Sequence, residues 1–109
     1  MYLSGLWKNN ADNFELAGEE GEILLIFKAK NANIVAGSDN SGEIFVYLNN
    51  APLDKDARGQ DVKLTGNNSI ADIREFKLYN LVSAKDYDLY ALDLVVEGKC
   101  FKIYTFTFG

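Results

Sequence analysis

The sequence predicts an all-β fold, an antiparallel β-sandwich or jelly roll. Short apolar or alternating runs recur along the chain, clusters of Gly, Asn, Asp and Ser separate them, and a single proline interrupts the pattern. A chain of 109 residues has the length of one domain, and folding at this size buries roughly two-thirds of the unfolded surface. Because 48% of the residues are apolar and 13% are aromatic, they suffice for one core without disulfides.

The first half of the chain contains three strand signals. In residues 22–29, apolar side chains occupy both the even and the odd positions, which is typical of a central strand buried on both faces. Residues 33–36 form a second run, and the turn residues of 38–42 end it. Residues 43–48 are rich in β-branched and aromatic side chains, and the pair 49–50 ends this third run.

The second half continues the same alternation. Residues 61–65 alternate cleanly and stop at the turn signal of residues 66–68. In the next long run Asp93 marks one face as wet, and the other face carries four apolar residues: Tyr90, Leu92, Leu94 and Val96. Glu97 and Gly98 then predict a hairpin turn.

The last run, residues 99–108, changes parity. Phe101 and Ile103 fall on one face, and the opposite face receives three aromatic residues: Tyr104, Phe106 and Phe108. Either this strand is buried on both sides, or a bulge near Ile103 switches its inward face.

Residues 69–82 leave helix and strand open. Ser69 and Asp72 form a possible capping box, and a helical spacing follows at four positions: Ile70, Ile73, Lys77 and Leu81. Residues 76–81 alternate poorly as a strand. Local pattern alone does not decide between the two, and residues 69–75 are the most ambiguous.

The charge and the short apolar runs of the chain argue against two classes of partner. The net charge is −5 with a pI of about 4.6, and the eleven Lys and Arg residues are scattered. A phosphate backbone requires clustered basic residues, so we expect no nucleic-acid partner. The longest apolar run, residues 23–27, is far below the ~18 residues of a membrane span, and the chain shows no signal peptide. We expect no membrane insertion.

The residue types argue against catalysis and against a cofactor. The chain has no histidine, which excludes triads and zinc sites built on that residue. Cys100 has no second cysteine to resolve a mixed disulfide, so we interpret it as a structural cysteine, buried or at a strand edge. Carboxylate pairs remain possible as catalysts, but the acidic residues fall in predicted loops that are typically solvated, Glu19 and Glu20 in one loop and Asp54, Asp56 and Asp61 in or near another.

Those same three aspartates are candidates for a structural calcium ion. Asp54, Asp56 and Asp61 could offer oxygen ligands. Their spacing does not match an EF-hand loop, and Lys55 and Arg58 dilute the charge. We therefore predict no metal and note the calcium alternative.

Two aromatic residues are candidates for ligand binding. In an extended strand, Phe45 and Tyr47 point opposite to Ile44, Val46 and Leu48. If the aliphatic set fills the core, the aromatic pair lies on the outer face of the sheet as a platform for a sugar ring. The alternative is that a loop or a partner domain covers the pair.

Two other aromatic residues have structural interpretations. Trp7 is expected in the core or as a lid over one end of the sandwich. Tyr79 is expected to bond its hydroxyl to a buried backbone group.

Several separated pieces of the chain carry a family resemblance, and residues 106–109 with the pairs 78–79 and 81–82 are its most specific parts. The pieces are residues 3–7, 27–29, 33–35, 77–82 and 104–109, together with 44–52 and the downstream Asp61. In this order they resemble the C-terminal domain of DipZ-type thioredoxin-family proteins. The chain departs from that family at residues 49–50, where Asn-Asn stands in place of the usual Asp-Gly type of pair.

The resemblance implies a jelly roll similar to galactose-binding and carbohydrate-binding modules, and it favours strand from Phe76 onward. It also implies that residues 1–109 form one accessory β-sandwich domain of a longer, extracytoplasmic protein with a thioredoxin-like domain upstream. The leading hypothesis is a non-catalytic module that binds carbohydrate. The alternative is a structural domain that docks on the thioredoxin-like domain or on another protein. The sequence does not identify the ligand or the oligomeric state.

Overall fold

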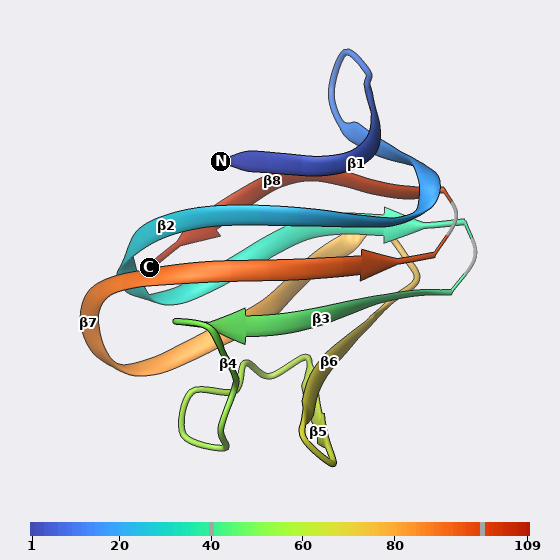
Figure 1. Cartoon of the computed structure of the whole chain (residues 1–109). Coiled ribbons are helices and arrows are strands. Elements are labelled where there is room, and N and C mark those ends of the chain that lie inside the picture. Colours follow the sequence, from blue (N-terminus) through green and yellow to red (C-terminus); the bar gives the residue numbers. More distant parts are fainter. Residues whose placement is uncertain (40, 99) are drawn as a thin grey trace.

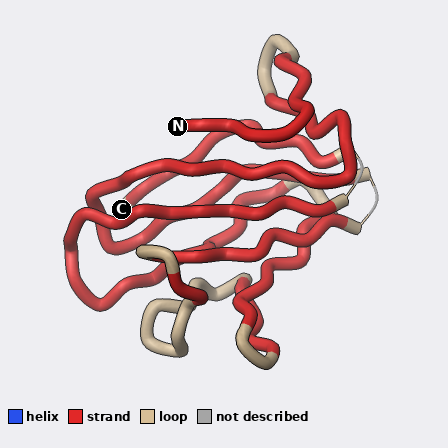
Figure 2. The backbone as a smooth tube through the Cα atoms, in the orientation of Figure 1, coloured by secondary structure: helices blue, strands red, loops and turns tan. Residues whose placement is uncertain are grey.

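The computed structural model describes residues 1–39, 41–98 and 100–109, and strands and turns make up this part of the chain (Figure 2). The all-β prediction is confirmed. Within the described residues, no helix is long and apolar enough to span a membrane. The strands are β1 Tyr2–Asn9, β2 Phe14–Ser38, β3 Gly42–Leu48, β4 Ala51–Pro52, β5 Val62–Thr65, β6 Asn68–Ile73, β7 Lys77–Glu97 and β8 Phe101–Phe108.

All strands belong to one open antiparallel sheet. Its order is β1-β2-β7-β3-β6-β5, with β4 paired to β3 and β8 paired to β2. β2 and β7 are much longer than the other strands, and each crosses the molecule, turns at one end and returns (Figure 1). The antiparallel part of the prediction is therefore confirmed. The jelly-roll sandwich stays a prediction, because the strands form a single sheet.

The curved sheet encloses one hydrophobic core. Both halves of β2 contribute to it, with Ile23 and Phe27 before the turn and Ile34 and Ala36 after it. Alternation places these side chains inward, because successive residues of a strand point to opposite faces. The four predicted inward residues of β7 follow the same rule: Leu92, Leu94 and Val96 are buried, and Tyr90 packs against the core.

The expectation that residues 22–29 are buried on both faces is wrong. Leu24 is 38% exposed and Ile26 is 70% exposed. These residues have the opposite parity to the buried Ile23 and Phe27, so they point away from the core. Charged residues of the same parity, Glu22 and Lys28, bracket the exposed pair.

The helix alternative for residues 69–82 is also wrong. β6 and the start of β7 are strands, joined at residues 74–76. The poor alternation has a cause in the pairing of β7 with β2: Ala32 pairs with Val82 and Asn33 with Asn80, which leaves Leu81 as an extra residue. A bulge of this kind places two consecutive residues, Leu81 and Val82, in the core.

Ser69 uses its hydroxyl in tertiary structure and not as a helix cap. The hydroxyl donates to the Val46 carbonyl at 2.5 Å and accepts from the Leu53 amide at 2.9 Å. It is the buried polar residue that connects β6, β3 and the segment after β4.

The predicted bulge in the last strand is confirmed. Val35 pairs with Thr105 and Ala36 with Ile103, so Tyr104 is the extra residue. The inward face switches there, from Phe101 and Ile103 to the half-buried Phe106. Beyond it, Phe108 stacks on Phe27 with 5.2 Å between ring centroids, and the Gly109 amide donates to the Asn31 carbonyl. The end of the chain is held in the sheet.

The predicted turn at residues 49–50 is confirmed. Asn49 and Asn50 have φ angles of 51° and 67°, the left-handed conformation that Asn tolerates better than most residues. The turn connects β3 to β4, and the Asn49 side chain accepts a hydrogen bond from the Ala91 amide of β7. The hairpin predicted at Glu97 and Gly98 is wrong. Gly98 has a φ of 129°, but β7 pairs with β2 and β3 and β8 pairs with β2, so within the described residues the two strands on either side of this turn are not partners.

Replacing Ser69 by Ala tests the tertiary role of this hydroxyl. The variant leaves a buried amide and carbonyl without their partner, so we expect a loss of about 1–3 kcal/mol in unfolding free energy. Urea unfolding followed by fluorescence measures it. Ser83→Ala, at an exposed position of β7, is the control and should change stability little. Equal effects of the two substitutions would contradict the assignment.

Candidate functional site: the outer face of the sheet

The structure places Phe45 and Tyr47 on the outer face of the sheet. Both are half-buried, and the residues between and before them, Ile44 and Val46, lie in the core. Leu48, also expected inward, is partly buried and packs against the core. The aromatic pair is therefore accessible from outside, flanked by β7 on one side and by β4 and β6 on the other.

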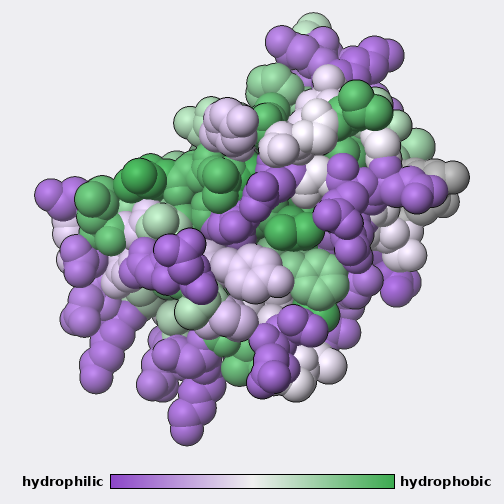
Figure 3. Space-filling model, viewed as in Figure 1, coloured by the Kyte–Doolittle hydropathy of each residue, from purple (hydrophilic) through white to green (hydrophobic). Residues whose placement is uncertain are grey.

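A group of exposed apolar side chains, which we call the outer patch, continues this face across β7, β2 and β1. Tyr2 lies opposite Leu24, and Leu24 lies opposite Asp93, which in turn lies opposite Tyr47. One transverse row thus joins β1 to β3. The outer patch consists of Met1, Tyr2, Leu24, Ile26 and Leu89. Figure 3 views this face and shows apolar groups gathered over β1 and β2, with hydrophilic residues between them.

The outer patch contains an open hollow of about 480 Å³. Met1, Tyr2, Leu24 and Ile26 line it together with residues of β7. Ile26 lies opposite Ala91 in the ladder, and this small side chain leaves room at the surface. The lining is apolar, so the hollow suits an apolar side chain and not an ion.

A pair of carboxyl groups, Glu22 and Asp93, lies in the middle of the outer face. Glu22 pairs with Val95 while Asp93 pairs with Leu24, so the two acids are diagonal neighbours on adjacent strands. Asp93 Oδ1 is buried and has no hydrogen-bond partner within the described part of the chain. Protonated Glu22 can donate a hydrogen bond to the Asp93 carboxylate, and this raises the pKa of Glu22 above its usual range. Burial of Glu22 and the negative charge of Asp93 raise the same pKa further.

Sequence reasoning missed both the outer patch and the carboxyl pair. The signal was present in the parity of β2, because Glu22 and Lys28 share a face with Leu24 and Ile26. Charged residues at both ends of an apolar stretch indicate a solvent-facing side. The pairing of Glu22 with Asp93 was not accessible, because it depends on the register of strands some seventy positions apart in sequence.

The calcium candidates make backbone contacts. Asp54 Oδ1 accepts hydrogen bonds from the amides of Asp56 and Ala57, both at 2.9 Å, and closes a turn. Asp61 Oδ2 accepts from the Asn80 amide at 2.7 Å and anchors the same loop to β7. Within residues 1–39, 41–98 and 100–109, no three His, Cys, Asp or Glu residues form a group that could hold a metal ion. The calcium alternative stays a prediction, to be tested by melting with a chelator.

The other loop acids are placed differently from the expectation. Glu19 and Glu20 lie within β2 and not in a loop. Glu20 pairs with Glu97 at the end of the β2–β7 ladder. The two acids are therefore held on a rigid element.

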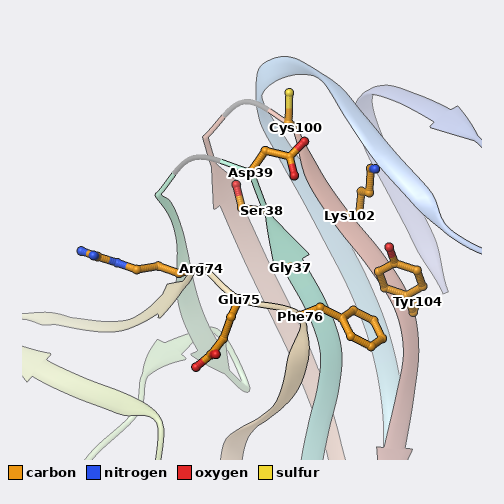
Figure 4. Close-up of a pocket in the computed structure, with 9 residues that line it drawn as sticks. All are labelled: Gly37, Ser38, Asp39, Arg74, Glu75, Phe76, Cys100, Lys102 and Tyr104. Carbon is orange, nitrogen blue, oxygen red and sulfur yellow. The ribbon is translucent and has the colours of Figure 1, made fainter.

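Cys100 lies in the turn before β8, and not inside a strand as expected. It is half-buried with a φ of 60°. It borders a hollow of about 250 Å³ whose lining also includes Arg74 and Lys102. Phe76 and Tyr104 line the same hollow, and their rings make an edge-to-face contact with 4.6 Å between centroids. Figure 4 shows the thiol directed away from these two rings. The chain offers no second thiol to resolve a mixed disulfide.

Two structural aromatic residues occupy their expected places. The Tyr79 hydroxyl donates to the Glu75 carbonyl at 2.6 Å and accepts from the Arg74 amide at 3.1 Å. The Trp7 ring is partly buried against the core. It covers Gly21, where an added Cβ would come within 2.7 Å of the indole. Both residues therefore have structural roles.

Comparison with known proteins identifies the family. A family described as thioredoxin like C-terminal domain matches residues 1–109, the whole of this chain. No curated protein matches the sequence. The chain belongs to the thioredoxin-like C-terminal domain family.

Neutralising Glu22 tests the carboxyl pair. The pKa of Glu22 is raised in the folded state. The protonation of Glu22 therefore contributes to the stability of the folded state below the unfolded Glu pKa of about 4.3. This contribution is lost as the pH rises through the pKa that Glu22 has in the folded state. We expect Glu22→Gln to gain about 0.5 kcal/mol at pH 7, the size usual for partly exposed charges, and less at pH 4.

Urea midpoints at the two pH values measure this difference. Asp56→Asn removes the same charge from an exposed loop position and is the control. A Glu22→Gln variant that is less stable than the wild type at pH 7 would rule out repulsion within the pair.

Proposed function

We propose, with this family membership as the premise, that the domain is a non-catalytic accessory module that docks through its outer face on a thioredoxin-like domain of the same protein. The observation that carries the proposal is the outer patch. Large apolar side chains rarely cluster on the free surface of a soluble domain, and where they do they mark an interaction site. Ile26 is 70% exposed and Leu89 is 60% exposed in the isolated chain.

The chemistry and size of the face favour a protein partner. Leu24, Ile26 and Leu89 are aliphatic, and protein interfaces bury such side chains in their centre. The domain measures 34 × 28 × 23 Å. Its broad side can therefore supply the ~800 Å² per partner that a standard interface needs.

The residue types support a division of labour within the whole protein. Thiol-disulfide exchange requires an attacking and a resolving thiol, and this chain has one cysteine and no histidine. Redox chemistry would then belong to the thioredoxin-like domain, and this module would have no enzymatic activity or cofactor of its own. The similarity to DipZ-type proteins extends the proposal to an extracytoplasmic location.

Carbohydrate binding is a second candidate, favoured by one local arrangement. Tyr47 lies directly opposite Asp93, and the Asn49 amide lies in the turn that follows β3. An aromatic ring beside carboxylate and amide groups can stack on a pyranose and bond its hydroxyls. The carbohydrate-module-like jelly roll belongs with this candidate, and Phe45 and Tyr47 would be its ligand-binding residues.

Removal of the outer patch tests docking. The thioredoxin-like domain of the same polypeptide, produced separately, should bind this chain in calorimetry. Because buried aliphatic side chains dominate such an interface, we expect the double variant Leu24→Ser and Ile26→Ser to bind at least about tenfold more weakly. Leu78→Ser removes an exposed leucine from outside the outer patch and should bind as the wild type does. A gene that encodes no thioredoxin-like domain, or equal affinity for all variants, would refute docking.

Tyr47→Ala tests the second candidate. Titration with cell-wall polysaccharide should show saturable binding that the variant loses, while its circular-dichroism spectrum stays that of the wild type. Phe76→Ala, which removes an exposed aromatic side chain from the segment between β6 and β7, serves as the matched control. The absence of a glycan signal from the wild-type chain would remove carbohydrate binding.

A further inference from the structure

The outer face carries a transverse row of carboxylates at the end remote from Lys28 and Leu89. Glu20 lies opposite Glu97, Glu97 lies opposite Glu43, and Glu43 lies opposite Asp72. We call these four residues the acidic row. Because paired residues of a sheet share a face, all four side chains leave the sheet on the same side as the outer patch.

The acidic row is unfavourable for the isolated domain. Like charges directly opposite each other in an antiparallel ladder destabilise it. Among the residues that the structure describes, the one ion pair that reaches the row joins Lys63 Nζ to Asp72 Oδ2 at 2.8 Å. Lys63 is on β5, at the far end of the row from Glu20. Repulsion among these carboxylates lowers the stability of the domain, and the fold does not require it. We take this as an indication that the acidic row has a role in binding.

An open hollow of about 430 Å³ lies along the acidic row. Its lining includes three acids and one cation: Glu43, Asp72, Glu97 and Arg74. The acids of the row are carried by four different strands, so their spacing is set by the sheet and not by flexible loops. A long basic side chain from another protein can enter this hollow and meet several carboxylates at once.

The acidic row, the carboxyl pair and the outer patch succeed one another along the strands. On β2, Glu20, Glu22, Leu24 and Ile26 are alternate residues of one face. The same order holds on β7, from Glu97 through Asp93 to Leu89. The face is therefore anionic at one end and apolar at the other. A partner must match both ends, which fixes its orientation.

We infer that the outer face binds a protein surface that carries clustered Lys or Arg side chains beside an apolar area, with the basic cluster over the acidic row. This inference rests on the proposed docking function and specifies the chemistry of the docked surface. Opposite charge across an interface speeds association and excludes wrong orientations. Pairing with the partner's cations also relieves the repulsion within the acidic row.

Carboxyl footprinting of the full-length protein tests the inference directly. Carbodiimide-coupled labelling reports each Glu and Asp, and the isolated 109-residue chain is the reference. We expect Glu20, Glu43 and Glu97 to be labelled at least about threefold more slowly in the full-length protein, because a cationic surface covers them. The exposed acids Asp12, Asp39 and Glu75, which lie outside the row, should be labelled equally in both.

Salt provides the second readout. Protection of the three glutamates should fall by about half or more between 50 and 500 mM NaCl, because partly exposed charge pairs are screened. Hydroxyl-radical footprinting of Leu24 and Ile26 on the same samples separates the two proposals. Protection of these two residues without protection of the glutamates would overturn the inference and leave docking intact. No protection of either set would overturn both.

Discussion

The antiparallel pairing of β2 with β7 is the constraint on which the rest of the structure depends. It runs from Glu20 opposite Glu97 to Ala36 opposite Lys77, through the turn that both strands make together. Because both strands bend at the same place, the halves before and after the bend face each other. The apolar side chains of the two halves meet inside the curve and form one core. β1 and β8 pair with β2, and β3 pairs with β7. The remaining strands therefore add to the sheet that the β2–β7 ladder begins.

The same ladder decides what the outer face contains. Every inward residue of β2 or β7 has an outward neighbour, and the register sets which outward residues of the two strands lie side by side. It brings Glu22 to Asp93 and Leu24 to the row that ends at Tyr47. The carboxyl pair opposes stability at neutral pH, because the charge of Asp93 disfavours the ionised form of Glu22 and raises its pKa. Groups that oppose stability beside an exposed apolar patch are characteristic of binding faces.

Bulges explain where pattern reasoning succeeded and where it did not. The parity change after Ile103 was visible because large aromatic residues lie on either side of it, and the extra residue is Tyr104. The bulge at Leu81 was hidden, because two adjacent apolar residues also fit a helical spacing. Ser69 added to the ambiguity: its position suits a helix cap, but the hydroxyl bonds Val46 and Leu53 from other strands. Local sequence does not contain those partners.

By itself, the sequence determined the all-β class, the Asn49–Asn50 turn and the parity of Phe45 and Tyr47, since these follow from alternation and from backbone preferences of single residues. It also excluded histidine chemistry and an internal disulfide. Only the tertiary structure decided that Leu24 and Ile26 are exposed, that Glu22 meets Asp93, and that four acids form a row. Alternation gives each residue one of two faces, but which face is covered and which residues become neighbours depend on long-range pairing between strands.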